Sequence, residues 1–257
     1  MVQRRGYAIC TQPRSGSNLL CQYLSSTDQL GYPLEYFNGP GRRALGLPDF
    51  PDAPELQIDA ILHLGSSPNG VYAVKLFASQ FAAFSPHVRW TDLLPNLRFV
   101  YLCRDDLLGQ AISWARALQT GQYRSTQSEG RIAVYDANLI RSQLLTIVQE
   151  RARWEAFFAR TGIEPLRIVY ERFLEDQLSH VTLIADLMDV ENPIIDHRRI
   201  DLVLQRDAVT EDWRQRFQAE RGDPNVLDDL EPNVPSIIRK VLSGFGLGRG
   251  TLRTRPM

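Results

Sequence analysis

Hydrophobic positions along the chain gather into short runs that predict buried β-strands. Each run is rich in apolar and aromatic residues and is bounded by turn-forming residues. The runs span residues 6–10, 71–76, 97–103 and 166–169. Helical spacing lies between and after them, at residues 17–25, 80–90, 106–118, 137–161, 177–188 and 196–207. Strands that alternate with helices predict an α/β fold, in which helices cover both faces of a parallel sheet.

Two segments without a clear period are rich in Gly and Pro. The first, residues 38–54, is interpreted as a long loop, and loops of that length in compact domains are often functional. The second begins at residue 222 and predicts a division into a domain, residues 1–221, and a C-terminal extension, residues 222–257. The extension holds one short amphipathic piece, residues 236–242, and we expect its last ten residues to form a mobile tail.

Composition and charge are those of an ordinary globular protein. Hydrophobic residues make up 44% and charged residues 23% of the 257 residues, which argues against a disordered or fibrous chain. The 29 Lys and Arg nearly balance the 30 Asp and Glu, for a net charge of -1. No overall charge therefore attracts nucleic acid or an anionic membrane, and any anion site must be local.

The cysteines and the longest apolar stretches predict a compartment. Cys10, Cys21 and Cys103 lie inside apolar runs without C-x-x-C spacing, a pattern typical of small buried residues in a reducing environment. No stretch resembles a signal peptide or approaches the ~20 apolar residues of a membrane span. We expect a cytoplasmic protein without a transmembrane segment.

The candidate chemistry begins where the first strand passes directly into a helix. The connecting residues are Pro13, Arg14, Ser15, Gly16, Ser17 and Asn18. Backbone N–H groups, the positive end of the helix and the Arg14 side chain converge there, which favours a phosphate-like anion. The simplest alternative is an ordinary strand-to-helix turn.

A second segment repeats this design. Arg104 follows the strand at residues 97–103, Asp106 is placed to cap the next helix, and Ser113 lies on that helix. Both arginines lie at carboxyl ends of strands, where open parallel sheets bind ligands. Two such sites suit a ligand with two separated phosphates, although Ser113 could also be a solvent-facing helical serine.

The first loop is not that of a nucleoside triphosphatase. The pattern G-x-x-x-x-G-K-[ST] is absent, and Arg14 is the cation of the turn. No acidic residue closes any of the first three predicted strands, where a kinase would hold Mg²⁺. We therefore expect a site that binds no metal. A P-loop-like kinase and a non-catalytic nucleotide-binding protein remain as alternatives.

These motifs together resemble those of sulfotransferases. Residues 11–17 resemble the 5′-phosphosulfate loop, and Arg104 with Ser113 resembles the 3′-phosphate site. The resemblance extends to the bacterial trehalose 2-sulfotransferase-like family through residues 31–38, 69–76 and 113–121. It covers about residues 6–215. Two departures from cytosolic sulfotransferases stand out: Arg14 replaces a common Lys, and no clear R-K-G-x-x-G-x-x-K segment lies near the end.

The resemblance implies a P-loop-like sheet, a donor and an acceptor. The donor would be 3′-phosphoadenosine 5′-phosphosulfate (PAPS), and the acceptor a hydroxyl of a sugar or glycolipid. It also makes a homodimer plausible. Arg14 and the N–H groups of residues 15–18 would stabilise the leaving phosphate, and Lys75, at the end of the second strand, could reach the transferred group. A solvated Lys75 is the simpler alternative.

Glu35 is the expected general base, as the Glu of this motif is in the resembling family. Apolar neighbours on both sides should bury its carboxyl and raise its pKa toward that of a useful base. A loop Glu paired with Arg42 or Arg43 is the alternative. Four histidines, the usual base in cytosolic relatives, lie away from the phosphate loop in sequence: His63, His87, His180 and His197.

Aromatic residues suggest the remaining contacts. Trp114, Arg116 and Tyr123 could stack against a sugar or adenine, and Tyr36 and Phe37 could form the acceptor pocket with the loop at residues 38–54. The acceptor class itself rests on the family resemblance.

Overall fold

The computed structural model describes residues 4–122, 130–202 and 208–228. Internal contacts divide the chain into one unit of residues 1–222 and a second of residues 223–257. All that follows concerns the first unit. The predicted amphipathic piece at 236–242, the predicted tail and Tyr123 lie outside the described residues, and the division into a domain and an extension stays a prediction.

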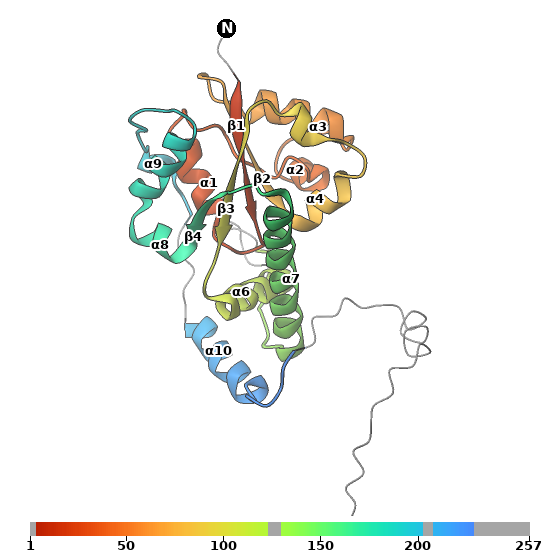
Figure 1. Cartoon of the computed structure of the whole chain (residues 1–257). Coiled ribbons are helices and arrows are strands. Elements are labelled where there is room, and N and C mark those ends of the chain that lie inside the picture. The colour runs from red at the N-terminus through yellow and green to blue at the C-terminus, as the bar shows by residue number, and fades with distance from the viewer. Residues whose placement is uncertain (1–3, 123–129, 203–207, 229–257) are drawn as a thin grey trace, which may run out of the picture. The chain divides into compact units, whose positions relative to one another are not determined.

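A sheet of four parallel strands forms the centre of the first unit (Figure 1). The strands are β1 (Arg5–Thr11), β2 (Val71–Phe77), β3 (Leu97–Cys103) and β4 (Leu166–Val169). Their order across the sheet is β2-β1-β3-β4, so β1 and β3 are interior. All four predicted strands are confirmed, because short apolar runs bounded by turn-forming residues identify strands that helices cover.

Helices connect and follow the strands. They are α1 (Ser17–Ser26), α2 (Gly39–Ala44), α3 (Pro54–Leu64), α4 (Ala78–Phe84), α5 (Trp90–Leu93), α6 (Leu107–Thr120), α7 (Ala137–Thr161), α8 (Tyr170–Glu175), α9 (Gln177–Leu187), the 3₁₀ helix η1 (His197–Arg199) and α10 (Ala208–Arg221). The predicted helices at 17–25, 106–118, 137–161 and 177–188 are confirmed to within two residues at each end.

Three helical predictions need correction. The predicted helix at 80–90 is two short helices, α4 and α5, because Pro86 lies between them and has no N–H to donate to the preceding turn. The segment 38–54 is not a plain loop, since the Asn38 side chain accepts from the Gly41 N–H and caps α2. Within 196–207 the described helix is η1 alone, and α3, α8 and α10 were not predicted.

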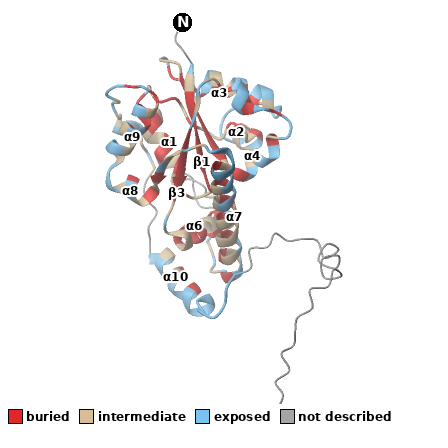
Figure 2. Cartoon of the chain, viewed as in Figure 1, coloured by how far each residue is buried: buried red, intermediate tan, exposed pale blue. Residues whose placement is uncertain are grey.

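Both faces of the sheet are covered, as predicted. One face packs against α3, α4, α5 and α7 through a cluster rich in aromatic rings, which includes Trp90 and Trp154. The other packs against α1, α8 and α9 through mainly aliphatic side chains. Figure 2 shows the strands as the most continuously buried part of the unit. The fold is therefore a three-layered α/β sandwich around a parallel sheet.

A third apolar cluster lies beyond the carboxyl ends of the strands. It joins α6, α7 and α10 through Ile112, Ile140, Trp213 and Phe217, all buried. Figure 1 places α6 and α10 past the carboxyl edge of the sheet, at the foot of α7. This cluster brings α10, from the far end of the described chain, to the edge where both predicted anion sites lie.

The structure shows the environment of the three cysteines and the hydropathy of the described helices. Cys10, Cys21 and Cys103 are buried and free of disulfides, as predicted. Among the described residues, none of the helices combines the length and the apolar character needed to cross a bilayer. The compartment stays a prediction.

The third cluster can be tested by truncation on α10. We expect Trp213→Ala to lower the free energy of unfolding by about 3–5 kcal/mol, because it leaves a large cavity between α10 and α6. Val209→Ala, on the exposed side of the same helix, should change it by less than about 0.5 kcal/mol. Denaturant unfolding measures both, and equal effects would show that α10 does not pack through Trp213.

Candidate active site

The loop between β1 and α1 adopts a strained backbone. Arg14 has φ 62° and Gly16 has φ 85°, both in the left-handed region. A Cβ at position 16 would lie 2.1 Å from the ring of Tyr170, so only glycine fits there. Such strain in a non-glycine residue persists where the surroundings enforce it, commonly at ligand sites.

The surroundings hold the carbonyl groups of this loop. Three carbonyl oxygens accept hydrogen bonds from side chains of other elements: Thr11 from Trp154 Nε1 at 3.0 Å, Pro13 from Gln110 Nε2 at 2.7 Å, and Arg14 from Arg104 Nη1 at 3.5 Å. An anion that approaches the loop therefore meets N–H groups at the start of α1, where a helix lacks internal partners. Sequence reasoning missed Gln110 and Trp154, because a buried helical Trp or Gln has the same pattern as a core residue.

The hydroxyl of Ser15 has a structural role. Thr11 Oγ1 donates to the Leu102 carbonyl at 2.9 Å and lies 2.7 Å from Ser15 Oγ. A hydroxyl has one proton, so Ser15 must donate in the second contact. Ser15 is fully buried. Its backbone N–H is then the donor that remains for an anion.

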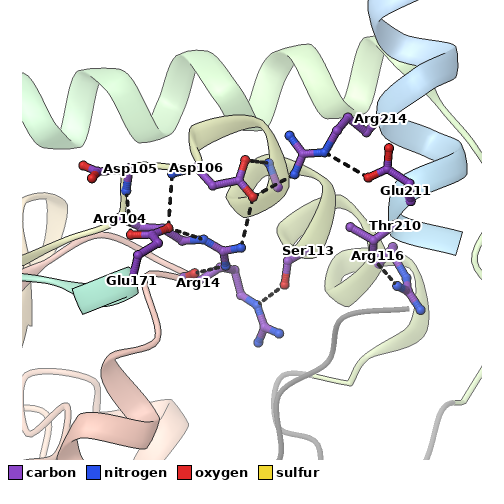
Figure 3. A network of polar contacts seen from close by, with 11 residues as sticks. Arg14, Arg104, Asp105, Asp106, Ser113, Arg116, Glu171, Thr210, Glu211 and Arg214 are labelled. Carbon is purple, nitrogen blue, oxygen red and sulfur yellow. Dashed lines mark hydrogen bonds and ion pairs between the residues drawn. The ribbon is translucent and has the colours of Figure 1, made fainter. Parts of the chain in front are cut away.

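The two groups of residues predicted to bind anions are in contact in the structure. Arg14 Nε donates to Ser113 Oγ at 3.0 Å, which joins the phosphate loop to α6 (Figure 3). Ser113 is thus not a solvent-facing serine. The prediction that Arg14, Arg104 and Ser113 share one edge of the sheet is confirmed.

Arg104 lies among two carboxylates and an aromatic ring. Its Nη2 is 3.4 Å from Asp106 Oδ2, its Nε is 3.7 Å from Glu171 Oε1, and its guanidinium lies 5.2 Å from the Tyr170 ring centre. The Nε is buried, and no acceptor among the described residues is within hydrogen-bonding distance of it. A buried guanidinium donor of this kind is available to an incoming anion.

Asp106 links this site to α10. Its carboxylate accepts from the Gly109 N–H at 2.9 Å, which confirms the predicted helix cap, and from Arg214 Nη2 at 2.7 Å. Burial acts to raise the pKa of Asp106, but the hydrogen bonds from Arg214 and Gly109 and the nearby guanidinium charges lower it overall. A second link runs from Arg116 to Thr210, at 2.9 Å (Figure 3).

These residues surround a cavity of about 560 Å³. Its lining includes Arg14, Arg104, Ser113, Arg116, Thr210 and Arg214. Asp106 and Glu211 also line it, so the four arginines leave a local excess of two positive charges in a chain whose net charge is -1. The sequence did not reveal Thr210 and Arg214, because nothing in the pattern of α10 shows that it packs beside α6.

Glu35 and Lys75 form a second group, next to the phosphate loop. Lys75 Nζ lies 2.8 Å from Glu35 Oε1 and 2.6 Å from Asn18 Oδ1, and the lysine side chain is 5% exposed. Backbone pairing of Leu34 with β2, through the Lys75 N–H at 2.9 Å, sets Glu35 beside the strand. The interpretations of a solvated Lys75 and of a Glu35 paired with Arg42 or Arg43 are therefore wrong.

The predicted direction of the Glu35 pKa is also wrong. Burial alone would raise it, as expected. However, the Lys75 ammonium and hydrogen bonds from Lys75, Asn38 and Gln80 outweigh burial and lower the pKa to about 2. The sequence showed the apolar neighbours but not these partners, of which Lys75 and Gln80 are about forty residues away.

The aromatic residues and histidines considered from the sequence differ in how far they are buried. Tyr36 is fully buried and donates to the Tyr32 carbonyl, while Phe37 stacks on Phe84 with ring centres 3.8 Å apart. Tyr36 is a core residue, whereas Phe37 is partly buried at the edge of the core, and the acceptor pocket stays a prediction. Of the histidines, His63, His87 and His197 are exposed. Among the described residues, no group of three or more His, Cys, Asp or Glu side chains is arranged to hold a metal ion.

Comparison with known proteins decides the family. The Stf0 sulphotransferase family profile matches residues 6–220. The chain belongs to the Stf0 sulfotransferase family. It is similar to trehalose 2-sulfotransferase of Mycobacterium tuberculosis, with 26% identity over 84% of this chain and 95% of that protein. The enzyme of the same name from Mycolicibacterium smegmatis is 24% identical over 83% and 94%.

A solved structure matches this sulfotransferase along most of its length. The crystal structure of a sulfotransferase from Alicyclobacillus acidocaldarius covers 84% of this chain and 92% of its own, with 18% identity and a TM-score of 0.44. The matched family region includes the phosphate loop, Glu35, Lys75, the Arg104 site and nearly all of α10.

The buried pair can be tested by its pH dependence. Because the pKa of Glu35 is about 2 in the folded protein and ordinarily 4.5, its contribution to stability is complete above about pH 4.5 and is lost as pH falls toward 2. We expect Glu35→Gln to cost roughly 3–5 kcal/mol at pH 7, because it leaves Lys75 charged and buried, and to flatten the acid limb.

Two comparisons make this test specific. The double variant Glu35→Gln/Lys75→Met should recover most of the loss. Asp52→Asn, which breaks the exposed pair with Arg43, should cost less than about 1 kcal/mol. Denaturant unfolding from pH 2.5 to 7 provides the data, and an acid limb that Glu35→Gln leaves unchanged would contradict the low pKa.

Proposed function

We propose that this sulfotransferase moves the sulfuryl group of PAPS to a hydroxyl of a carbohydrate or glycolipid. The observation that carries the proposal is the contact of Arg14 with Ser113 beside Arg104. It joins the phosphate loop, through Arg14, to the cavity that Arg104 and Ser113 also line, an arrangement that suits a donor with 5′ and 3′ phosphates. The relatives named trehalose 2-sulfotransferase support a small sugar, such as trehalose, as the acceptor.

The donor would lie along the cavity with its two ends on different elements. The 5′-phosphosulfate is assigned to the loop of Pro13, Arg14, Ser15, Gly16, Ser17 and Asn18. The 3′-phosphate is assigned to Arg104 and Ser113. The Arg104 Nε is buried and has no hydrogen-bond acceptor among the described residues. Arg116 and Arg214 line the same cavity and add positive charge for the nucleotide.

Sulfuryl transfer would be an in-line displacement. The acceptor oxygen forms a bond to sulfur while the bond from sulfur to the 5′-phosphate oxygen breaks, and the hydroxyl proton passes to Glu35. Arg14, Lys75 and the loop N–H groups stabilise the charge that develops on the leaving phosphate. With a pKa of about 2, Glu35 is ionised at neutral pH and can accept that proton.

The competing functions would require different residues in the phosphate loop and at the Glu35–Lys75 pair. A kinase of the P-loop type carries Lys in its phosphate loop, whereas this chain has Arg14. A non-catalytic nucleotide-binding protein would need neither Glu35 nor Lys75, which are buried together beside the loop. A homodimer and a cytoplasmic location are kept as expectations from the family resemblance and the sequence.

Thermal-shift titration tests the donor site. We expect 3′-phosphoadenosine 5′-phosphate, the product nucleotide, to stabilise the protein by roughly 2.7 kcal/mol at 100 times its Kd, and ATP with Mg²⁺ to stabilise it far less. Arg104→Ala should weaken binding of this nucleotide at least tenfold while leaving that of adenosine 5′-monophosphate unchanged, since only the former has a 3′-phosphate. Stabilisation by ATP with Mg²⁺ alone would support the kinase.

A transfer assay tests the base. With labelled PAPS and a panel of sugars that begins with trehalose, Glu35→Gln should reduce turnover by about a hundredfold or more, because general bases contribute about 10²–10⁴-fold. Its affinity for 3′-phosphoadenosine 5′-phosphate should be retained. Glu55→Gln, an exposed glutamate on α3, is the matched control. Full turnover in Glu35→Gln, with loss in His87→Ala, would assign the base to histidine.

A further inference from the structure

Lys75 is shared between two parts of the site that have different tasks. Its Nζ contacts Glu35 Oε1 at 2.8 Å on one side and Asn18 Oδ1 at 2.6 Å on the other. Asn18 is the second residue of α1, so it belongs to the anion-binding end of the phosphate loop. One buried cation thus bridges the carboxylate and the loop.

The two oxygens of Glu35 are held differently. Oε2 accepts from Asn38 Nδ2 at 3.1 Å and from Gln80 Nε2 at 3.2 Å. Gln80 is fixed in turn, since its Oε1 accepts from the Phe77 N–H at 3.0 Å. Oε1 is the oxygen that faces Lys75. If the lysine turned away, the carboxylate would stay anchored through Oε2, and Oε1 would become available to a proton.

We propose that an anion on the phosphate loop draws Lys75 away from Glu35, so that binding of the sulfuryl donor is what frees Oε1 to accept the proton of the acceptor hydroxyl. This inference rests on the proposed function. Lys75 acts here as a positioning residue for the base and as a counter-charge for the donor. No covalent bond is made or broken until the acceptor is in place.

The surroundings of Glu35 determine the direction of the effect. Lys75, on β2, is the charged residue that acts on its carboxyl among the described residues, while Asn38 and Gln80, from its own loop and from α4, are neutral donors. When Lys75 turns toward an anion, its lowering effect on the pKa weakens and the effect of burial, which raises the pKa, gains weight. The carboxylate becomes a stronger base only when a donor is present.

The consequence is an order of events. In the empty enzyme Glu35 is ionised but weakly basic, so it does not activate a hydroxyl or water when no sulfuryl group is available. With the donor bound, its basicity moves toward the operating pH, where general-base catalysis is most efficient. Donor binding and base activation are then two outcomes of one rotation of the Lys75 side chain.

Carbon-13 NMR of the glutamate carboxyl groups measures this directly in the full-length protein. The Glu35 signal is assigned by its loss in Glu35→Gln. In the free protein we expect no titration of this signal above about pH 3.5, and with saturating 3′-phosphoadenosine 5′-phosphate we expect a midpoint of about 4 or higher, near an ordinary glutamate.

Variants of Lys75 distinguish two ways in which the nucleotide could raise the pKa of Glu35. The nucleotide could draw the lysine away, or its negative charge could repel the carboxylate directly. In Lys75→Met the midpoint should already be at 4 or above without nucleotide and should move by less than about half a pH unit when nucleotide binds. Lys75→Arg, which keeps the charge, should restore the low midpoint of the free protein and the shift on binding.

Each result decides between the alternatives. A nucleotide that binds to the native protein without moving the Glu35 midpoint would overturn the inference while leaving the donor site intact. A shift in Lys75→Met as large as in the native protein would also overturn it, because the anion would then act on Glu35 without the lysine. A protein whose melting temperature and spectra do not respond to the nucleotide would overturn the proposed function and, with it, this inference.

Discussion

The site depends on the direction of the carbonyl groups in one short loop. A phosphate-binding turn must present N–H groups and keep its carbonyl oxygens away from the anion. Here the indole of Trp154, the amide of Gln110 and the guanidinium of Arg104 hold three of these oxygens, against the strain of a left-handed Arg14. Each donor comes from a different part of the fold. The packing of the three layers therefore determines that the loop presents its N–H groups, and not these carbonyl oxygens, to an anion.

The sequence predicted what is local and missed what is assembled. The four strands were found because strands covered by helices are short apolar runs. Arg14, Arg104 and Ser113 were placed at the carboxyl edge of the sheet because each follows a strand or lies on the helix after it. Lys75 and Glu35 were chosen separately, and their pairing appeared only in the structure. The pKa of Glu35 was misjudged because hydrogen-bond partners from β2 and α4 leave no local signal. Residues of α10 were missed for the same reason, since tertiary packing alone brings them to the cavity.

Charged side chains at the candidate site are buried or partly buried and lie in ion pairs that a bound anion would rearrange under our proposal. Lys75 is paired with Glu35, and Arg104 and Arg214 with Asp106. A buried cation without a partner would be costly in the empty protein. Before the donor binds, protein carboxylates therefore pair with the cations that phosphate and sulfate oxygens would contact afterwards. This exchange limits the affinity that the positive cavity can offer and favours ligands with enough negative charge to compete.

The bonds that restrain the phosphate loop join residues far apart in the chain. Trp154 lies 143 residues after the carbonyl it holds, and Gln110 lies 97 residues after its partner. During synthesis the loop emerges early, yet it cannot assume its anion-binding shape until α7 has been made and has packed. The motif is therefore not a portable unit. Residues 11–18 transplanted onto the strand of another sheet would carry the sequence of the site without the donors that turn its carbonyl groups aside.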